Sequence, residues 1–281
     1  NNVILFLFAF ACLYPMLHVV FASFSDPRLL IKHDGILLKP LGFSMVGYNI
    51  VFKNPNITTG YLNTLFYVGV GTSLNILLSS LGAYVLSRKN LLLKTQLTIL
   101  VVFTMYFSGG LIPNFLLVKN LGMYDTRWAI IVPVMISTWN MIVMKTAFSA
   151  IPDSLEESAK IDGANDFIIL FRIIIPVAKA TLAVMVLFYA VGHWNAWFNS
   201  MIFLRNRKLY PIQLLLREIL IANSSGGNIL EGNSMSDDDR ALVDVVIRYC
   251  TIVVATVPIL FIYPFCQKYF MKGVMLGSIK E

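Results

Sequence analysis

The sequence predicts an all-α polytopic membrane protein with six transmembrane helices. Of its 281 residues, 57% are hydrophobic and only 13% are charged, which is far more apolar than an average soluble domain. The apolar residues gather in segments that reach the roughly 20 helical residues needed to cross a bilayer core of about 30 Å. The predicted spans are residues 3–24, 61–86, 96–118, 128–147, 177–204 and 246–267. An even number of crossings places both ends on one side.

The first span is followed by a polar stretch. Residues 3–24 form a longer apolar run than the core of a typical signal peptide, and only a poor small-residue cleavage pattern lies near Ala22 and Ser23. We therefore interpret this run as a membrane helix. Residues 25–60 contain several prolines and glycines, and we expect them to form an ordered external loop.

The second span is unusually rich in small and polar residues. These are Asn63, Asn75, Ser79, Ser80, Gly82 and Tyr84. Such residues let helices approach closely and form interhelical hydrogen bonds. Prolines stand inside other predicted spans, at positions 113, 133, 258 and 264. There the missing amide can kink a helix and leave carbonyls for a partner or a cavity, or the ring can simply pack.

Between the fourth and fifth spans lies a polar loop, residues 153–176, that carries the most specific signal. Asp153 is predicted as the N-cap of a short helix, because Glu156 follows three positions later as in a capping box. Ser154 with Glu157 offers the same arrangement one residue on, so we expect the helix to start near Ser154. Gly163 is predicted to end this helix, since a residue without Cβ easily adopts the left-handed conformation. Apolar residues then recur at helical spacing, and Pro176 suits the start of a further helix. We expect two short helices at an angle.

This loop resembles the cytoplasmic Glu-Ala-Ala signature of binding-protein-dependent ABC importer permeases. Glu157 matches the glutamate of the signature, and the residues from Asp162 to Ala164 match its Asp-Gly-Ala core. Pro176 matches its proline. Ser158 departs from the pattern, because alanine is common there.

Other segments are similar to the carbohydrate branch of this family. They are residues 14–15 with 23–25 in the first span, residues 83–88 at the end of the second, and the tail 272–280. The tail is similar to permeases associated with complex oligosaccharides and aldouronates. Ala180 stands where carbohydrate permeases often have a second proline.

The resemblance implies a type I ABC importer permease fold, with residues 1–281 as a single transmembrane permease domain. It implies that residues 153–176 form a cytoplasmic coupling loop that docks in a cleft of an ATPase subunit. The residues implied in coupling are Glu156, Glu157, Ser158, Ala159, Asp162, Gly163, Ala164 and Pro176. The implied partners are a homologous second permease subunit, two cytoplasmic ATPase subunits that carry ATP and Mg, and an extracytoplasmic substrate-binding protein. The implied location is the bacterial inner membrane.

Residues 205–245 are predicted as the longest external loop. They mix Arg205, Arg207 and Lys208 with an apolar run at 214–221. In the resembled family the corresponding loop faces the substrate-binding protein, and a solvated connector is the alternative. The three cations suit an acidic oligosaccharide, and they equally suit lipid headgroups.

The fifth span carries the densest polar and aromatic cluster within a predicted membrane segment. Its members are His193, Trp194, Asn195, Trp197 and Asn199. Aromatic faces bind the C–H surfaces of sugars, and amide or imidazole groups bind their hydroxyls, so we expect a pathway lining. On one continuous helix Asn195 and Asn199 would share a face. Tryptophans that anchor at the membrane interface and asparagines that bond neighbouring helices are the alternative.

Other chemistry is sparse in the sequence. The phosphate-binding motif Gly-x-x-x-x-Gly-Lys-Ser/Thr does not occur, so we do not expect this chain to hydrolyse ATP. Cys12, Cys250 and Cys266 lie in predicted spans, where free cysteine behaves as a small apolar residue. We therefore expect neither catalytic residues nor a metal site. The net charge of +7 is scattered along the chain, which argues against nucleic acid as a partner.

The sequence therefore predicts the permease subunit of an ATP-driven importer for a carbohydrate, most simply an oligosaccharide. Two alternatives stay open. One is an ABC permease for another small solute, such as an amino acid or a polyamine. The other is a membrane-embedded enzyme with an interfacial amphipathic loop.

Overall fold

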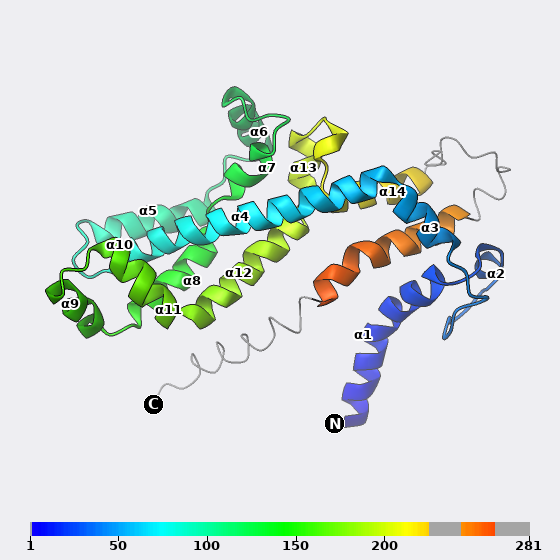
Figure 1. The fold of residues 1–281 in the computed structure, drawn as a ribbon, viewed down its shortest axis with the longest axis horizontal. Helices are drawn as coiled ribbons and strands as arrows, with labels where there is room; N and C mark the ends of the chain where they lie inside the picture. The colour runs from blue at the N-terminus through cyan, green and yellow to red at the C-terminus, as the bar shows by residue number, and fades with distance from the viewer. Residues whose placement is uncertain (1, 225–242, 262–281) are drawn as a thin grey trace. The chain divides into compact units, whose positions relative to one another are not determined.

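The computed structural model describes residues 2–224 and 243–261. Helices make up every regular element in these two ranges, apart from an isolated antiparallel bridge between Ser25 and Phe43. Figure 1 shows the helical elements in chain order. The described chain packs as two compact units, the first from residues 2–63 and 210–261 and the second from residues 64–209. The prediction of an all-α fold is confirmed.

The first unit contains the two ends of the described chain. Its helices are α1 (Asn2–Ser23), α2 (Pro27–Ile31), α3 (Val46–Lys53), the start of α4 (Pro55–Ser87), α14 (Ile212–Ser224) and a last helix, Val243–Phe261. Residues 25–54 form an ordered connection, as predicted, because Ser25 Oγ donates to the Phe21 carbonyl and accepts from the Leu41 amide. The predicted loop ends earlier than expected, since α4 already begins at Pro55.

The second unit holds the remaining elements. They are the rest of α4, α5 (Lys94–Tyr106), α6 (Leu111–Asn120), α7 (Trp128–Ile131), η1 (Val132–Val134), α8 (Thr138–Ser149), α9 (Asp153–Ile161), α10 (Asp166–Ile168), η2 (Ile169–Ile174), α11 (Ile175–Val177), α12 (Lys179–Trp194), α13 (Phe198–Phe203) and η3 (Arg207–Leu209). Helix α8 contacts both α5 and α12. Buried apolar side chains of α4, α8, η2 and α12 form one core, centred on Met144, Phe148 and Ile174, and Ala159 of α9 packs onto it.

Three helices among the described residues are long and apolar enough to cross a membrane, namely α1, α4 and Val243–Phe261. Three further candidates are bent pairs of helices, and counting each pair as one span gives up to six. The predicted number therefore agrees with the structure only if the bent pairs are spans. Residues 262–267 of the predicted sixth span lie outside the described residues, as do Pro264, Cys266 and the tail 272–280.

The other three candidate spans are bent pairs, and the third begins at Asp166, within the predicted polar loop, instead of at residue 177. Helices α5 and α6 meet at 110°, α7 with η1 meets α8 at 49°, and the run Asp166–Val177 meets α12 at 89°. The first break contains Gly110, whose φ of +88° strongly favours glycine. The second follows Pro133, which cannot donate an amide to the preceding turn. Each break frees backbone groups that need partners within the unit.

Candidate functional site

The polar loop at residues 153–176 begins with a helix whose capping differs from the prediction. Pro152 stands at the N-cap of α9 without a side-chain hydrogen bond, and Asp153 is already the first helical residue. The Asp153 carboxylate pairs with Lys89, and the Glu156 carboxylate pairs with Arg88 and Lys160. The predicted capping box is therefore wrong. Both acids bond cations instead of backbone amides.

The predicted turn at Gly163 is confirmed. Gly163 has a φ of +80°, its amide donates to the Lys160 carbonyl at 3.0 Å, and the Ala164 amide donates to the Ala159 carbonyl at 2.9 Å. This pair of bonds is the Schellman pattern that closes a helix with glycine. The next helix starts at once, since the Asn165 side chain accepts from the Ile168 amide at 2.9 Å.

The two helices of the loop are wound differently. After α10 the chain forms the π-helical turns of η2 rather than the expected α-helix. Pro176 is the second residue of α11, the last short turn before the 89° bend. The structure thus places a short α-helix and a second, wider helical run on either side of Gly163.

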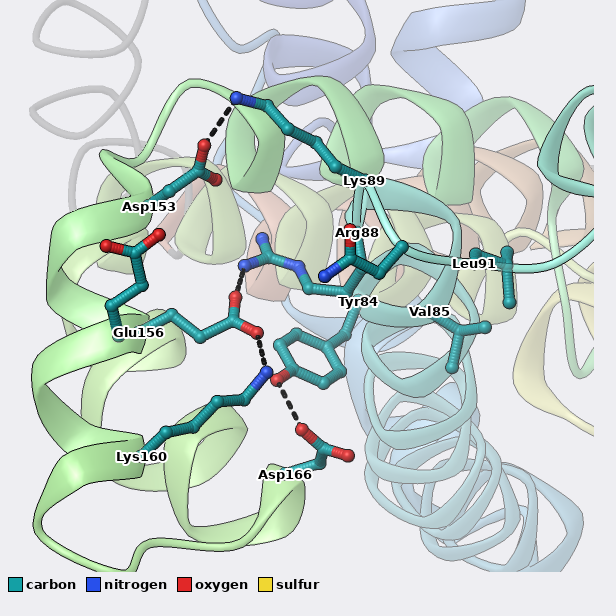
Figure 2. Close-up of a pocket in the computed structure, with 11 residues that line it drawn as sticks. Tyr84, Val85, Arg88, Lys89, Leu91, Asp153, Glu156, Lys160 and Asp166 are labelled. Atoms are coloured by element: carbon teal, nitrogen blue, oxygen red, sulfur yellow. Dashed lines mark hydrogen bonds and ion pairs between the residues drawn. The ribbon is translucent and has the colours of Figure 1, made fainter.

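Arg88 joins the end of α4 to this loop. Its guanidinium pairs with the Glu156 carboxylate, donates to the Phe148 carbonyl at 3.2 Å, and lies 4.9 Å from the centroid of the Tyr84 ring. The Tyr84 hydroxyl donates to Asp166 Oδ1 at 3.3 Å. Figure 2 shows these side chains converging from α4, α9 and α10. We call Tyr84, Arg88, Glu156 and Asp166 the Arg88 clasp.

The central ion pair of the clasp is largely shielded from solvent. The Arg88 and Glu156 side chains are 16% and 13% exposed, whereas the neighbouring Lys89–Asp153 pair is 78% and 49% exposed. Burial alone would raise the pKa of the Glu156 carboxyl, but hydrogen bonds from Lys160 and Arg88, with their charges, outweigh it and hold the pKa below its usual value. The clasp borders a cavity of about 370 Å³.

The residues predicted to act in coupling lie on two sides of the loop. Ala159 is buried and Glu156 points to Arg88, so these two attach α9 to the unit. The exposed members are Glu157, Ser158, Asp162, Gly163 and Pro176, and Ala164 is half-buried. Three large apolar side chains that sequence reasoning missed are also exposed around the turn: Leu155, Ile161 and Phe167. They were missed because their apolar character suggests a core, and only the fold shows that they face outward.

The second candidate cluster surrounds a cavity of about 380 Å³ in the second unit. Four of the five predicted lining residues border it, namely His193, Asn195, Trp197 and Asn199, while Trp194 is buried and does not line it. The helical face proposed for Asn195 and Asn199 is wrong, because α12 ends at Trp194 and α13 begins at Phe198. The break brings both amides to one cavity by a turn of the backbone.

Two sets of hydrogen bonds between uncharged groups, which we call rungs, lie beside this cavity. In the first rung Asn75 Nδ2 donates to the carbonyls of Val134 and Met135 at 2.7 and 2.8 Å, and Asn75 Oδ1 lies 2.6 Å from His193 Nε2. Since the amide nitrogen serves the carbonyls, Oδ1 is the acceptor and His193 Nε2 is the donor. The prediction of interhelical bonding by Asn75 is confirmed.

The second rung lies one turn away. Ser79 Oγ is 2.6 Å from Tyr189 Oη, which also accepts from the Ser137 amide at 3.2 Å. Residues 75 and 79 of α4 and residues 189 and 193 of α12 are four apart, so each pair shares a helix face. Both rungs bond the backbone at the break between η1 and α8. We call these four side chains, Asn75, Ser79, Tyr189 and His193, the neutral lattice.

A glycine makes room for the lattice. A Cβ on Gly71 would lie 2.5 Å from His193 Nε2, so only a residue without a side chain allows the ring to reach Asn75. The described lining of the cavity contains no Asp, Glu, Lys or Arg. Its amides, hydroxyls, imidazole and aromatic rings are groups that bind uncharged polyhydroxyl surfaces.

The predicted external loop at residues 205–245 is partly helical. Arg205 and Asn206 donate their amides to Asp125 Oδ1, both at 2.8 Å, and α14 occupies the apolar run that was predicted within the loop. Arg205, Arg207 and Lys208 are exposed. Residues 225–242 lie outside the described residues. Among the described residues, no group of three His, Cys, Asp or Glu side chains is placed to hold a metal ion.

Comparisons with known proteins agree on one family. The family model described as the binding-protein-dependent transport system inner membrane component matches residues 65–206, a stretch that nearly coincides with the second unit. The polygalacturonan/rhamnogalacturonan transport system permease protein YtcP of Bacillus subtilis is 44% identical over 277 residues, covering 98% of this chain and 95% of that protein. Protein LplC of the same organism is 35% identical over 266 residues, covering 95% and 88%.

A solved structure is also similar. It is that of a bacterial ABC transporter involved in the import of the acidic polysaccharide alginate, with a TM-score of 0.86 and 31% sequence identity. The match covers 96% of this chain and 95% of that chain.

Proposed function

Because this chain belongs to the family of binding-protein-dependent transport system inner membrane components, we propose that it is the permease subunit of an ATP-driven importer for a carbohydrate. Its assembly would contain a homologous second permease subunit, two cytoplasmic ATPase subunits and an extracytoplasmic binding protein, in a bacterial inner membrane. ATP and Mg belong to the ATPase subunits. This chain would form part of the pathway and receive the motion that ATP drives.

The observation that carries this proposal is the outward face of the polar loop. The exposed Leu155, Ile161 and Phe167 surround a glycine-closed turn, with Glu157 and Ser158 beside them. Exposed apolar side chains beside an acidic one are suited to a protein partner rather than to solvent. We assign the ATPase subunit to this face, and closure of the ATPase pair would pull α9.

The substrate that we propose is an oligosaccharide from an acidic polysaccharide. The functions of the relatives support it, because they concern polygalacturonan, rhamnogalacturonan and alginate. The cavity supports a sugar, since Trp197 offers an aromatic face and Asn195 and Asn199 offer amides. The exposed cations at residues 205–208 would meet the carboxylates outside the membrane, and the uncharged cavity would bind the hydroxyls.

Substitution of Gly163 tests the proposal. Gly163→Pro is incompatible with a φ of +80° and removes the amide that bonds Lys160. We expect the variant to insert into the membrane and to lose the ATPase stimulation that loaded binding protein causes in the assembled complex. Gly163→Asn is the matched control, because asparagine tolerates the left-handed conformation. Stimulation that survives Gly163→Pro, or a wild-type chain that copurifies with no ATPase subunit, would contradict the proposal.

A further inference from the structure

We propose that Arg88 is the positioning residue through which movement of the polar loop reaches α4 and the cavity, an inference that rests on the proposed function. The starting observation is how few contacts hold α9. Ala159 is its only buried residue, and Glu156 is its only other side chain that turns inward to a shielded partner. Besides the backbone connections at its two ends, a pull on α9 therefore acts on the unit mainly through these two side chains.

Arg88 contacts side chains or backbone of α4, α8 and α9 at once. It pairs with Glu156 of α9, and it donates to the Phe148 carbonyl near the end of α8. Its guanidinium stacks on Tyr84, whose hydroxyl reaches Asp166 at the start of α10. The clasp thus holds both helices that flank Gly163, as Figure 2 shows. A movement of the turn as a unit would carry the end of α4 with it.

Helix α4 continues without a break from the clasp to the neutral lattice. Asn75 lies in this helix 13 residues before Arg88, which directly follows the last helical residue, Ser87, and 13 helical residues correspond to about 20 Å along a helix axis. At Asn75 and Ser79 the same helix bonds α12 and the broken backbone beside the cavity. An α-helix is stiff along its axis. The continuous helix α4 can therefore transmit a displacement of the polar loop to the groups beside the cavity.

The chemistry of the Arg88 clasp is suited to transmitting movement between α9 and α4. The planar guanidinium directs donors to the Glu156 carboxylate and the Phe148 carbonyl, which the single ammonium of lysine cannot do with the same geometry. The pair is shielded, so water competes for it less than for an exposed pair. The Lys89–Asp153 pair connects the same end of α4 to the same helix α9, but it is exposed on both sides. It provides a natural comparison within the chain.

The test uses the full complex, in which this chain is assembled with its partner permease, ATPase subunits and binding protein. The binding protein is loaded with oligosaccharides from polygalacturonan, and the readouts are ATPase stimulation and sugar molecules transported per ATP. We expect Arg88→Gln to copurify with the ATPase subunits and to lose at least about fivefold in both readouts, the range of ordinary coupling effects. Glu156→Gln should lose as much, and the double variant no more than either single one.

The control variants separate a mechanical link from general stability. Lys89→Gln and Asp153→Asn should keep both readouts within about twofold of wild type, since exposed pairs contribute little. Arg88→Lys keeps the charge without the fork and should fall between Arg88→Gln and wild type.

Three results would overturn the inference. They are wild-type readouts in Arg88→Gln, additive losses in the double variant, and loss of the ATPase subunits from Arg88→Gln with full activity in Arg88→Lys. Failure of the proposed function is a separate result, because a wild-type complex would then show no stimulation or would contain no ATPase subunit.

Discussion

Helix α4 is held at the polar loop by charged side chains and beside the cavity by neutral ones. Arg88 and Glu156 keep a little contact with solvent, whereas Asn75, Ser79, Tyr189 and His193 are buried. A buried ion pair loses more solvation than its attraction returns unless its geometry is excellent. Amides, hydroxyls and a neutral imidazole avoid most of that cost and still satisfy the freed carbonyls. The contrast teaches that each cluster uses the strongest bonds its surroundings allow.

Removal of the amide from the neutral lattice should have the largest effect on stability. Asn75→Leu keeps a similar volume but leaves the Val134 and Met135 carbonyls and His193 Nε2 without their partner. We expect a loss of about 3 kcal/mol in the free energy of unfolding, since each unsatisfied buried group costs on the order of 1 kcal/mol in a membrane protein. Thermal unfolding of the detergent-solubilised chain measures this loss.

The matched control for this change lies on the same helix. Thr72 Oγ1 is buried and has no hydrogen-bond partner among the described residues. Thr72→Val should therefore be neutral or slightly stabilising. Equal effects of Asn75→Leu and Thr72→Val would show that the lattice contributes nothing beyond packing.

The space that α4 leaves for His193 offers the next test. In Gly71→Ala the new Cβ would lie 2.5 Å from His193 Nε2, so the ring must move away from Asn75. We expect a loss of about 2 kcal/mol, within the usual range for overpacking. Gly69→Ala, where the Cβ would meet no atom within 4 Å, should instead gain a few tenths to about 1 kcal/mol from helix propensity. Thermal unfolding of Gly71→Ala and Gly69→Ala measures both changes in stability. Similar changes in the two variants would contradict the predicted role of Gly71.

The pH dependence of the charged cluster should give the smallest effect and the clearest contrast. The pKa of Glu156 in the folded chain lies below its ordinary value of 4.5, so folding favours the carboxylate. Its contribution is present in full above about pH 4.5 and is lost as the pH falls through the depressed pKa. We expect the free energy of unfolding of wild type to exceed that of Glu156→Gln by about 1 kcal/mol at most near pH 7. This difference should vanish in acid.

The same titration distinguishes the two clusters. As the Glu156 carboxyl protonates, the stability lost in Glu156→Gln should decrease. The stability lost in Asn75→Leu should not decrease with it, because the Asn75 amide does not titrate. Unfolding curves at a series of pH values supply the measurement. A Glu156→Gln effect that grows in acid would mean that the folded chain prefers the protonated carboxyl, against the assigned bonds.

Much of the fold could be predicted because membrane helices need long apolar segments. The runs that became α1, α4 and Val243–Phe261 are readable in this way. The turn at Gly163 could also be predicted, since glycine tolerates a positive φ. The bend at Ala178 falls where the polar loop was predicted to meet the fifth span. The sharp break at Gly110 could not be predicted with the same ease, because hydropathy does not record the direction of a helix. The predicted N-terminal capping box of α9 failed because Arg88 and Lys89, 64 or more residues earlier in the chain, were competing partners for the two acids.

The sequence by itself determined the all-α class, the membrane character and the position of the polar loop, because these depend on local composition and on residues close in the chain. Only the tertiary structure decided which acid binds Arg88, which side chains occupy the broken helix beside the cavity, and which apolar residues of α9 face outward. Those outcomes depend on competition among partners 60 or more residues apart. Local patterns supply the donors and acceptors, and folding selects among them by distance and by access to water.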